Sequence, residues 1–400
     1  MRKIDLAIVG GGLAGGLLAL ALHRARPDLN FLLIEAGKTF GGHHRWSWFE
    51  SDLTPAGKEL LAPFPQVKWT SGYHVAFPGY KRKMHANYCS LSSKDFDKTL
   101  RETLPLETQS LGTRVKNFDS SSVTLADGER LEAGAVIDCR NIIASKHLEG
   151  GWQIFVGRHF KYKKPHGIKN PIIMDASVTQ HAPSGNRSAY RFMYVLPLAD
   201  DELFFEDTYY DEERALDENL LKYRIDQYNQ QIGLEEGTEI SREKGILPVI
   251  TGGDFKAYLS SFEKQGVAMA GARGGFNHPL TSFTMPFAVS NALAIAGKAN
   301  LTGEELAKFV KTRALRHWRK TSIYRALGRM LFKATEPERR VGIFEMFYKN
   351  SQELIERFYA GQTTMMDRMH ILTGKPPVSI ARAVRALVSK GKPLSKENSE

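Results

Sequence analysis

The chain has 400 residues, of which 42% are hydrophobic and 25% charged. This composition excludes a protein that is disordered over its whole length, and the length allows two or three domains of about 150 residues each. Two cysteines, Cys89 and Cys139, exclude a disulfide framework and lack metal-ligand spacing, so a reducing compartment is expected. The net charge is +11, and residues 301–400 supply nearly all of it, with 20 Lys and Arg against 10 Asp and Glu.

The N-terminal residues predict a strand–helix–strand unit. Residues 3–9 form a short apolar run, residues 13–26 read as a buried helix, and residues 31–34 form a second apolar run closed by Glu35. The unit is about 30 residues long, as a parallel crossover requires. Residues 6–22 also suggest a signal peptide, but the glycines among them would break an apolar helix.

A glycine motif joins the first strand to the helix. It reads Gly10-Gly11-Gly12-Leu13-Ala14-Gly15. Gly10 permits a tight turn, Gly12 lets the backbone approach a pyrophosphate, and Gly15 lets helix and strand pack closely, while Leu13 and Ala14 open the helix whose N–H groups face the phosphates. Glu35 would accept hydrogen bonds from a ribose hydroxyl, which favours FAD or NAD over NADP. The alternative is a glycine-rich turn without a ligand.

The remaining chain predicts mixed strands and a helix over residues 68–125, then a β-rich stretch, then helices. Short strands are expected at residues 136–138, 153–156, 172–174, 188–196, 203–208 and 266–270. Helices are expected at residues 211–232, at residues 287–299 and almost throughout residues 303–389, with breaks at Glu336-Pro337 and Pro376-Pro377.

Two later segments carry possible chemistry. Gly271-Ala272-Arg273-Gly274-Gly275 lies between a strand and an alanine-rich helix, where Gly271, Gly274 and Gly275 suit the flavin end of FAD. Phe204-Phe205-Glu206-Asp207 places two carboxylates behind two aromatic residues on one strand, so that one carboxylate must share a face with buried rings. An apolar setting raises a carboxyl pKa and makes a general acid, but a strand end with both acids in water is the alternative.

The excess positive charge is concentrated in the C-terminal quarter. Residues 311–340 hold ten basic and two acidic residues, and the expected helix at 311–331 mixes them with apolar side chains. This favours either docking on an anionic membrane surface or a solvated helix face, and no nucleic-acid module is visible. No stretch approaches 18 apolar residues, so no transmembrane helix is expected.

Taken together, these segments resemble the bacterial lycopene β-cyclases. The ordered set is specific although each piece alone is not. Besides the glycine motif and the Phe-Phe-Glu-Asp-Thr segment, the matching pieces are residues 42–48, 77–80, 136–140, 151–157, 171–176, 190–192, 196–198, 245–248, 278–279, 285–286, 357–359 and 374–377.

The resemblance implies an enzyme that closes the ψ end-groups of lycopene, or a related linear carotene, to β-rings without net redox change. It implies that Glu206 is the acid and that Asp207 fills the second acidic position of the motif. It further implies that FAD acts in its reduced form, with NAD(P)H as the electron source. The chain departs from the family pattern at Arg45, Asn141 and Ser282, where the family has threonine, glycine and glycine.

The expected fold class is α/β, with a Rossmann-type FAD-binding domain, an inserted β-rich substrate domain and a C-terminal helical region. The FAD-binding domain takes residues 1–65, 101–150 and 261–302, and the substrate domain takes residues 66–100 and 151–260. A basic helical region follows at residues 303–390, with a polar tail at 391–400.

Peripheral attachment to the cytoplasmic face of the membrane is expected, and the oligomeric state stays open. The alternative functions are a flavin-dependent reductase or hydroxylase of an isoprenoid, and a membrane-attached flavoprotein or carotenoid carrier without catalytic activity.

Overall fold

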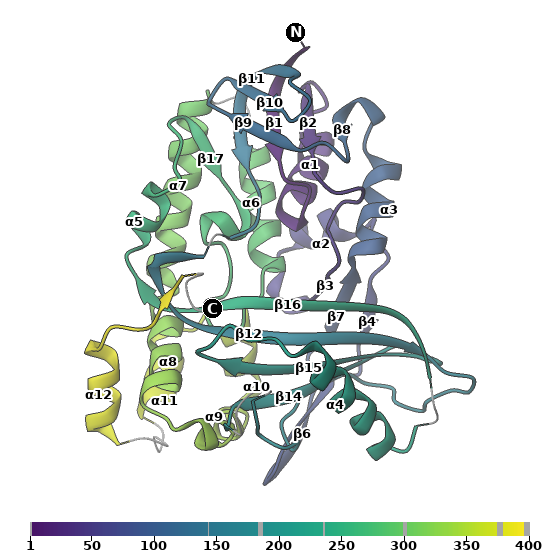
Figure 1. The fold of residues 1–400 in the computed structure, drawn as a ribbon, viewed down its shortest axis with the longest axis vertical. Helices are drawn as coiled ribbons and strands as arrows, with labels where there is room; N and C mark the ends of the chain where they lie inside the picture. The colour runs from purple at the N-terminus through teal and green to yellow at the C-terminus, as the bar shows by residue number, and fades with distance from the viewer. Residues whose placement is uncertain are drawn as a thin grey trace.

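The computed structural model describes residues 2–142, 144–182, 187–234, 237–298, 302–373 and 379–395. Figure 1 shows two main layers: a sheet that holds the N-terminus at the top, and below it a sheet of long strands that runs across the molecule. The C-terminal helices lie beside the lower sheet. The expected α/β class is confirmed.

The upper sheet contains the N-terminal crossover. β1 is parallel to its two neighbours, β2 and β11, and α1 (Leu13–Ala25) and α6 (Met285–Ala296) pack together beside it. The sheet has the order β8-β2-β1-β11-β10-β9, with β17 beside β11. The strands are β1 (Arg2–Val9), β2 (Phe31–Ile34), β8 (Gln109–Ser110), β9 (Val115–Phe118), β10 (Ser122–Leu125), β11 (Arg130–Asp138) and β17 (Val267–Met269).

The lower sheet is antiparallel except where β13 runs parallel to β5. Its order is β16-β12-β15-β14-β13-β5-β6, with β18 beside β12. The strands are β5 (Tyr73–Phe77), β6 (Tyr80–Met84), β12 (Ser145–Lys161), β13 (Ile172–Asp175), β14 (Tyr190–Ala199), β15 (Glu202–Asp211), β16 (Thr238–Gly253) and β18 (Pro393–Leu394). A third, small sheet consists of β3 (Arg45–Phe49), β7 (Tyr88–Ser92) and β4 (Val67–Trp69).

The remaining helices cover the two sheets and build the C-terminal quarter. None of the helices in the described ranges combines the length and the apolar character that crossing a membrane requires. They are α2 (Pro55–Leu61), α3 (Ser93–Thr103), α4 (Glu218–Gln231), α5 (Phe255–Ser260), α7 (Gly303–Lys320), α8 (Ser322–Lys333), α9 (Arg340–Phe347), α10 (Gln352–Tyr359), α11 (Met365–Thr373) and α12 (Ile380–Val388), with short 3-10 turns η1 (Glu50–Asp52), η2 (Leu106–Thr108), η3 (Gly271–Gly274) and η4 (Pro337–Arg339).

Several elements differ from the expected ones. The helix expected from residue 211 begins at Glu218, because β15 continues to Asp211, which pairs with Trp152 of β12. The run 238–253, not expected as a strand, is β16, which pairs with β12. In the tail expected to be loose, Pro393 and Leu394 pair with β12 and Leu394 is buried. The expected break at Pro376-Pro377 and the helix end at residue 299 lie outside the described residues, as do residues 396–400 of the tail.

The amphipathic helix expected at residues 311–331 is also corrected. The chain breaks at Thr321 into α7 and α8, and the apolar side chains of both helices pack inward. Trp318 stacks on Phe255 with 4.5 Å between ring centroids. Lys311 is paired with Glu263 at 2.7 Å, and Arg329 with Glu149 at 3.2 Å. The apolar side of these helices is therefore part of the core.

The alternation of side chains along β15 positions the acidic segment. Leu203, Phe205 and Tyr209 join the core cluster on one face, which includes Tyr228 of α4. Phe204 and Tyr210 join a second core cluster on the other face. Because neighbours in a strand point to opposite faces, Glu206 and Asp207 must lie on different sides of the sheet.

Candidate active site

One cavity of about 1130 Å³ runs between the two main sheets to the C-terminal helices. A single-ligand pocket typically measures about 300–1,000 Å³, so this cavity has room for a large ligand or for two ligands end to end. Its lining comes from the glycine motif, from the strands β3, β12, β15 and β16, from the segment before α6, and from α8, α9, α11 and α12.

At the upper end, the glycine motif forms a cradle. Gly10 has a φ of +104°, which favours glycine, and Gly15 lies so close to Gly10 that a Cβ atom on it would stand 2.0 Å from the Gly10 carbonyl oxygen. Gly12 has no atom within 4 Å of the position of such a Cβ, and it lines the cavity with Gly10, Leu13 and Ala14. Gly15 packs beneath them and does not line it.

The start of α1 carries no side-chain cap and no acidic residue in its first turn. Its free N–H groups and the positive end of the helix dipole therefore face the cavity without a competing protein acceptor. Glu35 also lines the cavity, and its two carboxylate oxygens accept hydrogen bonds from the backbone N–H groups of Gly11 and Gly37 at 2.7 Å each. Each oxygen keeps a lone pair for a hydroxyl donor. These residues fit a dinucleotide.

The second glycine segment contributes only in part. Gly271 lines the cavity, but Gly274 and Gly275 do not, which corrects the expectation that they contact the cofactor. A Cβ atom on Gly274 would stand 2.4 Å from the Met269 carbonyl oxygen, and Gly275 ends η3 with a φ of +76°. Both glycines serve the turn between β17 and the next segment. The neighbouring Ala272 and Asn277 line the cavity instead.

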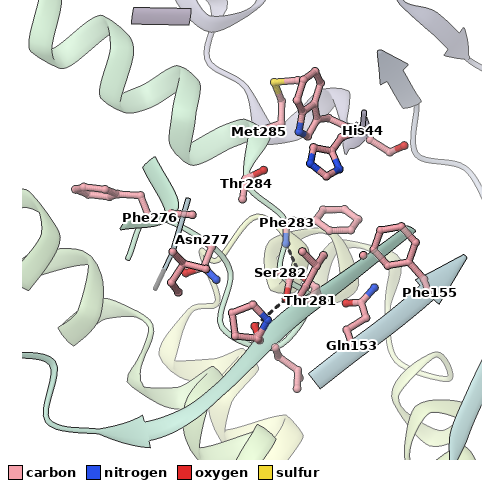
Figure 2. Close-up of a pocket in the computed structure, with 18 of the residues that line it drawn as sticks. His44, Gln153, Phe155, Phe276, Asn277, Thr281, Ser282, Phe283, Thr284 and Met285 are labelled. Atoms are coloured by element: carbon pink, nitrogen blue, oxygen red, sulfur yellow. Dashed lines mark hydrogen bonds between the residues drawn. The ribbon is translucent and has the colours of Figure 1, made fainter. Parts of the chain in front are cut away.

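The segment leading to α6 forms the wall opposite β12 (Figure 2). Residues 281–284 extend past Gln153 and Phe155, and α6 begins without a side-chain cap. Ser282 has a φ of +57°, the only positive value of a non-glycine residue within the described ranges, and its Oγ donates to the Pro248 carbonyl oxygen at 3.1 Å. The departure from the family glycine thus falls at a left-handed position.

At the lower end, Glu206 faces the cavity. It is partly buried, and its neighbours on that face include Tyr194 and Tyr210, which also line the cavity. Burial raises the pKa of Glu206 to about 7, a rise that the hydrogen bond from Thr208 at 2.6 Å opposes and the Asp207 charge reinforces. This carboxyl retains its proton over a much wider pH range than an exposed glutamate.

Asp207 lies on the other face of the sheet and does not line the cavity. It is fully buried, and its Oδ1 accepts a hydrogen bond from Nε of Arg191 at 2.6 Å. Burial raises the pKa of Asp207, and the charge of Arg191 opposes this rise. The structure therefore separates the two candidate acids: Glu206 faces the cavity and Asp207 is paired behind it.

Two cavity residues were missed as candidates. Glu243 of β16 lines the cavity, and burial raises its pKa to about 8. Arg45, noted in the sequence only as a departure, lines the same region and has its pKa lowered by burial. Glu243 stands in the polar run Ser241-Arg242-Glu243-Lys244, where no sequence pattern distinguishes it. Only the pairing of β16 with β12 reveals its position.

The aromatic residues of the cavity also differ from those considered in the sequence. The family resemblance covers Trp46 and Trp48 in residues 42–48 and the pair Phe204-Phe205, all of which could line a carotene site; Trp46 lines the cavity, whereas the other three are buried in the core. Most of the aromatic lining comes from other segments, namely Tyr88, Phe155, Phe192, Tyr194, Tyr210, Phe276, Phe283, Phe344, Phe347, Phe358 and Tyr359.

Comparison with known proteins places the chain among carotenoid enzymes. Residues 5–385 match the family described as lycopene cyclase protein. The chain is 40% identical to the lycopene beta-cyclase of Pseudescherichia vulneris over 385 residues, covering 96% of this chain and 97% of that one. It is 36% identical to the lycopene beta-cyclase of a Paracoccus species over 396 residues, covering 98% and 99%.

Solved structures share the fold at low sequence identity. A p-nitrophenol 4-monooxygenase from Pseudomonas putida matches with a TM-score of 0.61 and 15% identity, covering 90% of this chain and 99% of that chain. A geranylgeranyl bacteriochlorophyll reductase-like protein from Thermoplasma acidophilum matches with a TM-score of 0.56 and 14% identity, covering 97% and 99%.

Proposed function

The chain belongs to the lycopene cyclase family, and we propose that its cavity performs the acid-initiated, redox-neutral closure of the ψ end-groups of lycopene to β-rings. The single observation that carries this proposal is the position of Glu206. A carboxyl whose pKa burial raises to about 7 faces an aromatic-lined cavity large enough for a carotene end. Its partner in the motif, Asp207, is held in an ion pair outside the cavity.

The proposed step balances without an oxidant. The O–H bond of Glu206 breaks as a C–H bond forms at the terminal double bond, which leaves a tertiary cation. The next double bond along the chain attacks that cation and closes the six-membered ring, and a ring proton then returns to the protein. Aromatic faces such as those of Tyr194, Tyr210 and Phe155 stabilise the positive charge that passes through the cavity.

We propose FAD as the cofactor, in its reduced form. Gly10, Gly12, Leu13, Ala14 and the start of α1 would hold the pyrophosphate, and Glu35 the ribose. When bound and reduced, the flavin would supply negative charge that stabilises a cation electrostatically, without net electron transfer. NAD(P)H is the proposed electron source, because flavin reduction by hydride is the chemistry that this cofactor provides.

We also propose peripheral attachment to the cytoplasmic face of the membrane, because a carotene dissolves in the lipid bilayer. Support comes from the end of the cavity at α11 and α12, where Leu372, Val384 and Leu387 both line the cavity and are exposed. The same two helices expose further apolar side chains. We name the whole set the C-terminal rim: Met365, Met366, Met369, Leu372, Val384, Leu387 and Val388.

Substitution of Glu206 by Gln tests the acid. Gln keeps the shape but cannot protonate an alkene, so Glu206→Gln should bind FAD and lower ring formation by about 10²–10⁴-fold, the usual effect of losing a general acid. Product chromatography with lycopene and reduced FAD measures the rate. In deuterated water the unmodified protein should add one deuterium to each new ring.

Asp207→Asn is the matched control, because it removes a carboxyl from the other face of the same strand. It should weaken folding through the loss of the Arg191 ion pair, while the folded fraction still forms rings. Normal cyclisation by Glu206→Gln would move the acid elsewhere. A product heavier or lighter than lycopene in unlabelled water would favour the flavin-dependent reductase or hydroxylase.

A further inference from the structure

Three residues on neighbouring strands of the lower sheet are paired side by side. Gly157 of β12 pairs with Glu206 of β15 on one side and with Glu243 of β16 on the other. Residues that pair across strands point to the same face, and the spacing of about 4.8 Å between strands puts the two glutamate Cα atoms roughly 10 Å apart. The two long side chains therefore project from one face, on either side of a residue without a side chain.

The space over Gly157, between the two glutamates, is shared by the Phe204 ring and the Glu243 side chain. A Cβ atom on Gly157 would stand 3.0 Å from Cγ of Glu243, so the Glu243 side chain leans over the glycine toward β15. The same Cβ would stand 2.3 Å from Cζ of Phe204, so the tip of that ring lies over Gly157 on the same face. The first part of the Glu243 side chain therefore lies on the side that faces Gly157, beside the Phe204 ring.

Glu243 has an acid–base character that protonation of the carotene by Glu206 leaves unused. It is partly buried and lines the cavity with Glu206, and its carboxylate accepts a hydrogen bond from the backbone N–H of Arg45. Burial, together with the charge of Glu206, raises the pKa of Glu243 to about 8, while the charge and the backbone hydrogen bond of Arg45 oppose the rise. Two such carboxyls cannot both ionise readily, so they titrate as a pair.

The other charged and titratable groups around the pair do not neutralise it. Arg45 of β3 approaches from above, and its guanidinium lies 5.9 Å from the centroid of the Phe204 ring. The remaining groups are His159 of β12, which is held at 3.1 Å from Glu202, Tyr194 and Tyr210 in the cavity, and Asp207 behind the sheet. The pair therefore retains a proton although the positive charge of Arg45 acts on Glu243.

We propose that Glu243 is a second acid–base residue of the cyclisation, which holds a proton beside Glu206, passes it to Glu206 after that residue has protonated the carotene, and receives the ring proton. The bonds balance. The Glu206 O–H bond breaks and a C–H bond of the substrate forms. The Glu243 O–H bond then breaks as the Glu206 O–H bond is restored, and the C–H bond of the ring breaks as the Glu243 O–H bond is restored.

This inference rests on the proposed function, and the experiment separates the two. Glu243→Gln keeps the size and polarity of the side chain but cannot exchange a proton, whereas Glu243→Asp keeps a carboxyl. Lycopene conversion with reduced FAD is measured for both variants and for Glu206→Gln across pH 6–9, with flavin absorbance as the check of folding and cofactor binding.

We expect Glu243→Gln to bind flavin normally and to lower kcat by at least about tenfold, with the smaller part of the change in KM. In the unmodified protein, activity should fall with rising pH through two ionisations, because two coupled carboxyls lose their protons. In Glu243→Gln, activity should fall through one ionisation. Glu243→Asp should recover part of kcat. If Glu243 had only a structural role, Glu243→Gln would keep both the activity and the pH profile of the unmodified protein.

Unchanged kcat and pH profile in Glu243→Gln would overturn the inference and leave the proposed function intact. Loss of flavin binding in Glu243→Gln, or failure of Glu243→Asp to recover any activity, would also overturn it, because the residue would then act through structure. Failure of the unmodified protein to form rings would reject the proposed function itself.

Discussion

At the scale of single residues, the glycine motif separates two roles that look alike in the sequence. Gly12 borders the cavity with no atom within 4 Å of a hypothetical Cβ, whereas a Cβ on Gly15 would stand 2.0 Å from the Gly10 carbonyl oxygen. The first glycine leaves room for a ligand, and the second leaves room for the protein backbone. The two positions therefore differ in what a larger side chain would displace.

Gly12→Val should fold normally and lose FAD, because the added side chain enters the space proposed for the pyrophosphate. Gly15→Ala should instead destabilise the protein, since its Cβ can only be accommodated if β1 and α1 move apart. Thermal unfolding of the flavin-free proteins and flavin content after purification distinguish the two. A folded Gly12→Val protein with stoichiometric FAD would contradict the assignment.

Ser282 carries a local conformational cost that the structure partly offsets. A left-handed φ costs a non-glycine residue about 1 kcal/mol or more, and the hydrogen bond from Oγ to the Pro248 carbonyl returns about 1 kcal/mol. Ser282→Gly should therefore leave stability nearly unchanged, while Ser282→Ala should lose about 1 kcal/mol. Denaturant unfolding measures both, and an alanine variant more stable than the glycine variant would refute this account.

At the scale of elements, local patterns predicted the N-terminal crossover because its elements depend on short-range signals. The apolar run at residues 31–34, the glycine turn and the acidic residue that follows are all adjacent in the chain. In the same way, the alternation of Phe204 and Phe205 placed Glu206 and Asp207 on opposite faces, whereas the choice of Glu206 as the acid came from the family resemblance. Strand alternation needs only neighbouring residues.

Pairing between strands that are far apart in the chain could not be predicted from local sequence patterns. Glu243 reaches the cavity because β16 pairs with β12, and its own sequence is polar and unremarkable as a strand. The strand at Pro393–Leu394 likewise exists only because β12 offers an edge at its start. The inward packing of α7 and α8 depends on partners such as Phe255, so their basic residues looked more available in the sequence than they are.

The paired residues Glu206, Gly157 and Glu243 on three neighbouring strands give a prediction about stability and activity. Gly157→Ala places a methyl group 2.3 Å from the Phe204 ring and 3.0 Å from Glu243, so both side chains must shift. Overpacking of this kind costs about 1–3 kcal/mol. We expect lower thermal stability and slower ring formation with unchanged flavin binding. Wild-type activity in this variant would show that the spacing of the two glutamates is not critical.

At the scale of the whole molecule, the cavity connects two different surroundings. Its upper end meets the glycine motif and the start of α1, and its other end reaches the C-terminal rim, where Met366 is 76% and Val388 79% exposed. An apolar substrate that enters from the rim would bring its end-group toward Glu206 without crossing water. This arrangement fits a protein that takes a long carotene from a lipid phase one end at a time.

The C-terminal rim gives a prediction for membrane binding. Removing apolar side chains from it by Met366→Gln with Val388→Thr should weaken binding to phospholipid vesicles, because about 25 cal/mol is lost per Å² of apolar surface that would otherwise be buried. Vesicle co-sedimentation measures the change. Leu106→Gln is the matched control, since Leu106 is 82% exposed but lies in η2 beside the upper sheet. Equal weakening by the control would contradict the assignment of the rim.

The charge on this surface predicts a dependence on lipid and on salt. Arg385 and Lys390 are exposed beside the rim, whereas Arg316 and Lys320 are exposed on α7 away from the apolar side chains of α11 and α12. Exposed charges are screened over about 10 Å at 0.1 M salt, so binding to anionic vesicles should exceed binding to neutral ones and fall as salt rises. Arg385→Gln with Lys390→Gln should reduce this salt dependence more than Arg316→Gln with Lys320→Gln. If the α7 pair had the larger effect, the protein would dock through α7, and the cavity would open away from the membrane.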